Sequence, residues 1–448
     1  MSWRHRLMKN TALLTASSLG MRLLGMVWQV WLARRLGSAG IGLLQLVMSV
    51  GFFFSTLAIS GIRYTVTRLI AEELGQNRPG SVGRAMERAF AWALCFGCAA
   101  LAGLFFGADS IARHWVGDGR IAAALRYLAF SLPVGAVGSV LAGYFTAVGR
   151  VWKNAAHQLL EQLLRMGFTA AALAAAGEDP GRTCAAVTAA GALAEGLGCL
   201  VLGLFYRDDR RRHTLPGSVG PALTGRMVRL AAPLALSAWA RSGLGTLRQM
   251  LVPRCLRLSG LGSETALALY GVVTGMVMPV LLFPTCLPAA LAEVLVPLLT
   301  EKQVSGERDA LRTMARTLLS RTLLLSGGAA AFFFLAADLL GGALYHSAEA
   351  AGQFRRLALL TPLIYTDIVT DGFLKGLGEM NRSMLYNLAE AALGLVLSAL
   401  LLPRFGMSGY ILTLYLCEGF NFTLSLRRLW VLLHQSESQS VSPLSQES

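Results

Sequence analysis

Long apolar stretches follow one another along almost the whole chain, and few charges interrupt them. Mean hydropathy is +0.55, and only 15% of the 448 residues are charged, whereas a soluble protein carries about 25%. A helix needs about 20 apolar residues to cross a bilayer, and these stretches reach that length. The sequence therefore predicts an all-α polytopic membrane protein.

The apolar stretches predict about 12 transmembrane helices. We place them at residues 8–33, 41–66, 86–108, 121–147, 154–177, 181–206, 228–253, 265–299, 316–344, 355–378, 382–403 and 407–432. The longest polar connector is a basic linker at 207–226, which separates two lobes of six helices, 1–206 and 227–434. The Ser/Gln/Glu-rich tail 435–448 is predicted to be disordered.

Two sequence echoes relate the predicted lobes. The stretch Gly143 to Arg165 resembles Gly372 to Glu390 at an offset of 229 residues, and Ser81 to Arg88 resembles Asp309 to Arg316 at an offset of 228. An even number of spans per lobe gives both lobes the same orientation, so we predict a parallel repeat. The second echo also predicts a pair of amphipathic helices at the membrane surface.

The net charge of +15 bears on topology and partners. The even-numbered connections carry more arginine and lysine than the others, which predicts that both termini are cytoplasmic. Membrane lipids are expected partners of these basic loops. No basic-aromatic surface segment is present, so we expect no nucleic acid.

Four arginines fall inside or near the ends of predicted spans. They are Arg22, Arg63, Arg241 and Arg248. Intramembrane charges face the interior of a bundle or a water-filled cavity, and a guanidinium binds phosphate in a bidentate manner. We expect them to form an anion-attracting cavity, with substrate binding as their role. The alternative is that the arginines near span ends reach to lipid headgroups.

Acidic side chains inside the spans are candidates for ion coupling. Those singled out are Glu293, Asp367 and Asp371. Asp367 and Asp371 lie four residues apart on one helical face and could bind a proton or sodium ion. For Asp371, an ion pair with Lys375 one turn later is the favoured alternative.

The predicted span 265–299 contains Pro279, Pro284, Pro288 and Pro297, which predict a kinked or discontinuous helix. No phosphate-binding loop, metal-binding motif or catalytic Ser-His-Asp set is present. We therefore predict a protein that is not an enzyme, with no catalytic residue, metal or cofactor.

Several motifs together resemble a transporter family. Arg22-Leu-Leu-Gly25, Gly61-Ile-Arg63 and the junction Gly143-Tyr-Phe to Arg165 are similar in order and spacing to multidrug/oligosaccharidyl-lipid/polysaccharide exporters. The resemblance is to the stage V sporulation protein B-like polysaccharide biosynthesis branch. Arg63 stands where proline is common, and many members of this branch have fourteen spans.

The resemblance implies a monomeric, two-lobed flippase of the bacterial cell membrane. It would move undecaprenyl-pyrophosphate-linked saccharides across the membrane by alternating access, and related flippases use cationic residues such as one at the position of Arg22. A cation-coupled multidrug antiporter of the same fold is the main alternative, and a membrane scaffold or a lipid-embedded transferase are others. The sugar, the coupling ion and the pathway, sporulation or vegetative, stay open.

Overall fold

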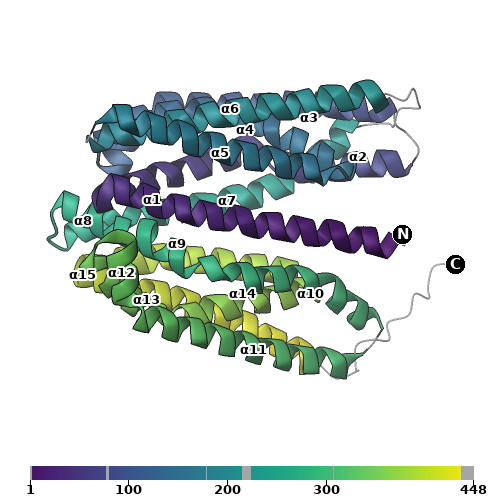
Figure 1. Cartoon of the computed structure of the whole chain (residues 1–448). Coiled ribbons are helices and arrows are strands. Elements are labelled where there is room, and N and C mark those ends of the chain that lie inside the picture. The colour runs from purple at the N-terminus through teal and green to yellow at the C-terminus, as the bar shows by residue number, and fades with distance from the viewer. Residues whose placement is uncertain (1–2, 77–79, 178, 214–222, 306, 435–448) are drawn as a thin grey trace. The chain divides into compact units, whose positions relative to one another are not determined.

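The computed structural model describes residues 3–76, 80–177, 179–213, 223–305 and 307–434, and all regular elements in these ranges are helical. This confirms the predicted all-α fold. Figure 1 shows the elements in chain order. They are α1 (Trp3–Ile59), α2 (Ile62–Gly75), α3 (Gly80–Ser110), η1 (Ile111–Val116), η2 (Gly119–Ile121), α4 (Ala122–Ala147), α5 (Val151–Ala176), α6 (Pro180–His213), α7 (Leu223–Leu258), α8 (Ser263–Gly271), η3 (Val272–Val277), α9 (Met278–Leu281), η4 (Phe283–Thr285), α10 (Cys286–Val304), α11 (Arg308–Leu335), α12 (Ala337–Tyr345), α13 (Ala348–Ala358), α14 (Thr361–Gly376) and α15 (Met380–His434).

The described helices establish a multi-pass membrane protein. Eight are long and apolar enough to cross a membrane, or nine if α13 and α14, bent by 51°, form one span. Two of the candidate segments, Gly20–Gly75 and Met380–His434, are 56 and 55 residues long, more than twice the roughly 20 residues that one crossing needs. The predicted total of about 12 spans stays a prediction.

Left-handed glycines interrupt the two longest helices. Gly37 has φ 71° inside α1, and Gly406 has φ 55° inside α15. A positive φ strains most side chains but not glycine. Both glycines lie between neighbouring predicted spans, so the chain breaks where the sequence predicts a connection.

The predicted long span 265–299 is discontinuous, as its prolines indicated. From α8 the chain passes into the π-helical turn η3, the short α9 and the 3-10 turn η4 before α10 begins at Cys286. Pro279 and Pro284 lie in this irregular stretch. Each removes a backbone donor, so a regular α-helix ends there.

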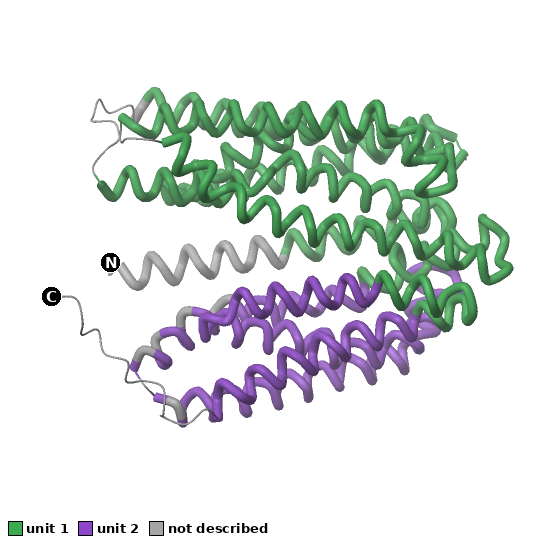
Figure 2. The backbone as a smooth tube through the Cα atoms, turned by 180° about the vertical axis from the view of Figure 1, so that it is seen from behind, with its two compact units in different colours: residues 1–279, 395–410 green, residues 280–394, 411–448 purple. Residues whose placement is uncertain are grey.

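The chain divides into two compact units (Figure 2). Unit 1 consists of residues 1–279 and 395–410, and unit 2 of residues 280–394 and 411–448. They differ from the predicted lobes 1–206 and 227–434 because α7, α8 and η3 pack against α1. The division into two lobes stays a prediction, made from the sequence repeat. Units 1 and 2 are defined by how the residues pack.

In unit 1, α4 packs against α3 and α6, and α5 covers α6 (Figure 1). On the other side of the unit, α1 crosses α8 at a contact between two backbones. A Cβ atom built on Gly271 would lie 2.0 Å from the Ser38 carbonyl oxygen and 2.7 Å from the Gly42 nitrogen. Only glycine permits this approach, so the crossing is specified by sequence.

The turn between α4 and α5 is anchored to the end of α6. Asp209 of α6 is only 2% exposed, and it accepts hydrogen bonds from Tyr144 at 2.7 Å and from Lys153 at 3.1 Å. Arg150 forms an ion pair with the same carboxylate. Since 207–213 belong to α6, the predicted linker 207–226 is helical at its start, and 214–222 lie outside the described residues.

Unit 2 contains a turn that resembles this one. Gly149 and Gly378 both have positive φ, 72° and 83°. After Gly378, Glu379 pairs with Arg382 at 3.0 Å and with Arg428 of the last helix. At the offset of 229 residues, Arg150 corresponds to Glu379, which has the opposite charge, and Lys153 corresponds to Arg382, which has the same charge.

A second likeness involves threonine bonds to glycine carbonyls. Thr67 of α2 donates to the Gly143 carbonyl at 3.1 Å, and Thr300 of α10 donates to the Gly376 carbonyl at 3.0 Å. Each bond ties a helix to the one that precedes the glycine turn. These likenesses are what a parallel repeat would produce, and the repeat stays a prediction.

The core of unit 2 forms where α10, α11, α14 and α15 meet. Leu295, Leu311, Val369, Phe373 and Leu429 are each at most 6% exposed there.

The prediction of two amphipathic surface helices was wrong. The arginine-rich stretches 81–88 and 309–316 are not separate surface helices but the first turns of α3 and α11.

Candidate functional site

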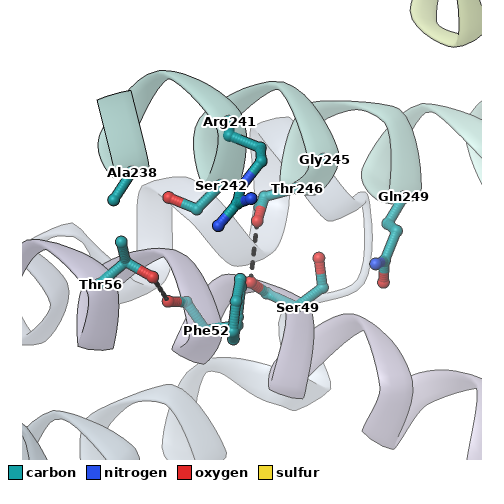
Figure 3. Close-up of a pocket in the computed structure, with 9 residues that line it drawn as sticks. All are labelled: Ser49, Phe52, Thr56, Ala238, Arg241, Ser242, Gly245, Thr246 and Gln249. Carbon is teal, nitrogen blue, oxygen red and sulfur yellow. Dashed lines mark hydrogen bonds between the residues drawn. The ribbon is translucent and has the colours of Figure 1, made fainter. Parts of the chain in front are cut away.

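A cavity of about 160 Å³ lies between α1 and α7 in unit 1 (Figure 3). It is lined by Ser49, Phe52, Thr56, Ala238, Arg241, Ser242, Gly245, Thr246 and Gln249. The α1 residues recur at intervals of three and four, which places them on one face of that helix. The α7 residues do the same, so two helix faces enclose the cavity.

One hydrogen bond joins the two faces. Thr246 of α7 donates to the Ser49 carbonyl at 2.9 Å, across the cavity, and Thr56 donates to the Phe52 carbonyl at 2.7 Å within α1. The Ser49 hydroxyl is buried and has no hydrogen-bond partner among the described atoms. Buried hydroxyls without a partner are uncommon, so this group is available to a ligand or to water.

Arg241 supplies the charge of this cavity. Its side chain extends from α7 toward α1 (Figure 3). Arg241 is exposed, and it forms neither a hydrogen bond nor an ion pair within the described part of the chain. None of the nine lining residues is acidic. The cavity therefore has a positive charge, neutral polar groups and one aromatic wall, a combination that suits an anion with a polar substituent.

The other predicted cavity arginines do not line this cavity. Arg22 on α1 and Arg63 on α2 are exposed, and within the described ranges neither side chain has a hydrogen-bond or ion-pair partner. Arg248 is half-buried and interacts electrostatically with Tyr410, a buried residue of unit 1. The structure thus places one of the four predicted arginines in a defined cavity.

Gln29 has a structural contact. Its side-chain amide donates to the Gly275 carbonyl at 3.1 Å and so joins α1 to η3. Gln29 lies seven residues after Arg22 and therefore on the same face of α1. Its amide nitrogen is occupied by the hydrogen bond to Gly275.

Sequence reasoning missed Ser49, Thr56 and Ser242. A signal for them was present, since Ser49 and Thr56 lie seven residues apart within the apolar span 41–66, a spacing that puts both on one helical face. Serine and threonine are common in membrane helices, however, because they can bond to their own backbone. The pattern alone does not separate a cavity wall from an ordinary helix face.

Unit 2 contains a buried polar cluster around Asp367 of α14. Asp367 is 8% exposed, and Asn421 of α15 donates to one of its carboxylate oxygens at 3.0 Å. Asn387 accepts a longer bond from Asn421 at 3.3 Å. The other Asp367 oxygen and the Asn421 side-chain oxygen are buried without a hydrogen-bond partner among the described atoms. Two acceptors are thus left without a donor.

The three predicted coupling acids differ in their surroundings. Asp371 pairs with Lys375 at 2.5 Å and accepts a hydrogen bond from Ser383, so its favoured alternative as an ion-pair residue is confirmed. Asp367 is buried and incompletely bonded. Glu293 belongs to α10, but its side chain lies outside the described residues.

In the part of the chain that the structure describes, no group of three or more His, Cys, Asp or Glu side chains could hold a metal ion.

Comparison with known families identifies the chain. Residues 7–303 match the model of the family described as polysaccharide biosynthesis protein. The chain belongs to this polysaccharide biosynthesis family. The match runs from the second turn of α1 to the penultimate residue of α10, and it therefore includes the Arg241 cavity.

A relative of known name is similar to the chain over almost its whole length, and solved structures share its fold. Stage V sporulation protein B of Bacillus subtilis (strain 168) is 24% identical over 446 residues, which cover 98% of this chain and 84% of that protein. An inward-facing multidrug resistance MATE family transporter of the MOP superfamily has a TM-score of 0.73 at 15% identity, over 92% of this chain and 95% of that one.

A second solved structure is a MOP superfamily transporter from Pyrococcus furiosus, whose description notes a binding pocket of reverse polarity. It has a TM-score of 0.63 at 15% identity, over 95% of this chain and 96% of that one. These likenesses show the fold. The polysaccharide biosynthesis family member described here thus has a MATE-like transporter fold.

Proposed function

We propose that this protein is a flippase for undecaprenyl-pyrophosphate-linked saccharides in a bacterial cell membrane, with both termini cytoplasmic and the monomer as the working unit. The observation that carries the proposal is the Arg241 cavity, in which an arginine without an acidic partner faces neutral polar groups. A lipid diphosphate carries the opposite charge, and the family is named for polysaccharide biosynthesis.

Each group in the cavity has a distinct role in this proposal. Arg241 binds a phosphate oxygen pair, since its planar guanidinium remains charged in a low-dielectric site. Ser49 and Gln249 hydrogen-bond to the saccharide, and Phe52 packs against a sugar face. Arg22, Arg63 and Arg248 add positive potential along the same path, while the polyprenyl tail stays in the lipid.

Movement of the cargo requires that the site opens to each side in turn. The glycine crossing of Gly42 and Gly271 joins α1 to α8, which belong to different predicted lobes. We propose that this crossing separates in one of the two states. The Gln29 bond to the Gly275 carbonyl would break in the same step.

The Asp367 cluster is the proposed coupling site. A carboxylate that is 8% exposed and hydrogen-bonded at only one oxygen is costly as a bare anion. A proton or a sodium ion would satisfy Asp367 and the Asn421 oxygen together. Asp371, already paired with Lys375, and the nearby Glu390 are the other charged groups of this cluster.

Efflux of cationic drugs is the second candidate function, and it is favoured by the likeness to MATE transporters. A site for cations requires carboxylates, and none lines the Arg241 cavity. The geometry therefore supports an anionic cargo better than a cationic one.

The test is transport by the purified protein in vesicles that contain a fluorescent undecaprenyl-pyrophosphate disaccharide. We expect Arg241→Gln to reduce the flipping rate at least about tenfold, the effect of losing about 1.4 kcal/mol of binding. Arg229→Gln is the matched control, since Arg229 is an exposed arginine of the same helix outside the cavity. Equal rates for the two variants would overturn the cavity assignment.

A further inference from the structure

A second cavity of unit 1 lies near the opposite end of α7 from the 207–226 connector. Its volume is about 290 Å³, and it is lined by His114, Trp115, Leu247, Met250, Leu251 and Arg254. The first two belong to the π-helical turn η1 that follows α3, and the other four to α7. None of the six lines the Arg241 cavity, so the two sites are distinct.

One arginine links the two elements that line this cavity. Arg257 donates to the Val116 carbonyl at 3.3 Å and so fixes the end of η1 against α7. Its guanidinium lies so close to Gly117 that an added Cβ atom would be 2.5 Å from the Nη2 atom. The Arg257 guanidinium is therefore bound to the turn η1. Arg120 is likewise held by an ion pair with Asp118 at 2.7 Å.

Arg254 differs from these two arginines. It is exposed, and in the described part of the chain it makes no hydrogen bond and no ion pair. No acidic residue is among the six that line the cavity. A fixed cavity with an unpaired guanidinium is complementary to an anion, and a phosphate group matches it best because two oxygens can bind at once.

The other walls indicate that the anion belongs to a lipid. Leu247, Met250 and Leu251 form an apolar surface next to Arg254. Trp115, 52% exposed, is the penultimate residue of the candidate span Gly80–Val116. Tryptophan is enriched at the level of the headgroups, and a guanidinium binds the phosphate of a headgroup in a bidentate manner.

We infer that this cavity binds the headgroup of an anionic phospholipid. Arg254 contacts the phosphate, Trp115 lies beside the glycerol region, and the acyl chains begin along Leu247 and Leu251. The inference does not depend on the transported cargo, since it concerns a separate cavity.

The experiment measures quenching of tryptophan fluorescence in nanodiscs. Brominated acyl chains on phosphatidylglycerol are compared with the same chains on phosphatidylcholine, and the Trp115 signal is the difference between the protein and its Trp115→Phe variant. We expect stronger quenching by the brominated phosphatidylglycerol. Arg254→Gln should lower its relative affinity about fivefold, the effect expected for one arginine near a charged membrane surface.

Arg113→Gln is the matched control. Arg113 is an exposed arginine of the same turn η1 that does not line the cavity, so the variant should keep the preference of the unmodified protein. All variants must elute as the unmodified protein does on size exclusion, which Arg254→Gln should satisfy because Arg254 has no partner to lose.

Three results would overturn the inference. Equal quenching by the two brominated lipids would exclude a preference for the anionic headgroup. An equal loss in Arg113→Gln and Arg254→Gln would show only a general attraction to the surface. Displacement of the brominated lipid by undecaprenyl pyrophosphate at far lower concentration than by phosphatidylglycerol would show that the cavity is a cargo site.

Discussion

Replacement of Asp209 by asparagine should strongly destabilise unit 1. The Asp209 side chain is 2% exposed and that of its partner Lys153 is 10% exposed, so the ion pair is buried. Asparagine preserves the shape and can still accept the Tyr144 hydrogen bond, but it leaves Lys153 and Arg150 without their shared counter-charge. Removing one member of a buried pair costs about 3–5 kcal/mol.

That free energy converts into a measurable change in melting temperature. An unfolding entropy of about 2.1 cal/mol/K per residue gives roughly 0.6 kcal/mol/K for a unit of roughly 300 residues. Asp209→Asn should therefore lower the melting temperature by about 5–8 °C. Thermal unfolding of the detergent-solubilised protein, followed by scanning fluorimetry at a fixed heating rate, measures this change.

Two further variants separate the buried pair from a general effect of lost charge. Asp309 is 96% exposed, and it pairs with Arg312 at 3.3 Å, so Asp309→Asn should change stability by no more than about 0.5 kcal/mol. The double variant Asp209→Leu/Lys153→Met should recover part of the loss, because apolar residues of similar volume can replace a buried pair, whereas Arg150 and Tyr144 still lose their contact with Asp209. A melting temperature for Asp209→Asn equal to that of Asp309→Asn would refute the reasoning.

Three other predictions follow from particular contacts. Gly271→Ala would place its methyl group 2.0 Å from the Ser38 carbonyl oxygen, so it should destabilise unit 1 by about 1–3 kcal/mol. Scanning fluorimetry measures this change. The control Gly225→Ala should leave the stability unchanged, because a Cβ atom there meets nothing within 4 Å. Glu73 is fully buried and pairs with the half-buried Arg226 at 2.5 Å, so Glu73→Gln should cost about 1.5–3 kcal/mol, and a shift no larger than that of Asp309→Asn would contradict this. Asp367→Asn should abolish the dependence of flipping on a proton or sodium gradient in vesicles, while Asp371→Asn, which breaks an ion pair, should retain it; the opposite pattern would assign coupling to Asp371.

The class of the protein follows from its amino-acid sequence alone. The long apolar runs require a membrane environment, because a water-soluble fold of this chain would have no core large enough to bury them all. The sequence also predicts several local features. They are the breaks at Gly37 and Gly406, the irregular stretch at Pro279 and Pro284, and the Asp371–Lys375 pair. Each depends on neighbours a few residues apart, and local rules of backbone geometry and helix spacing describe such neighbours.

Which charged groups come into contact depends on the packing of the helices. Arg22, Arg63, Arg241 and Arg248 look alike in sequence, yet Arg241 alone among them lines the described cavity, and Ser49 joins it from a helix nearly two hundred residues away in the chain. Neither Asp209 nor Asn421, which organise the two buried polar clusters, is a candidate residue by sequence. The reason is physical: helical periodicity fixes the face on which a side chain lies, but the neighbour of that face depends on how the helices pack.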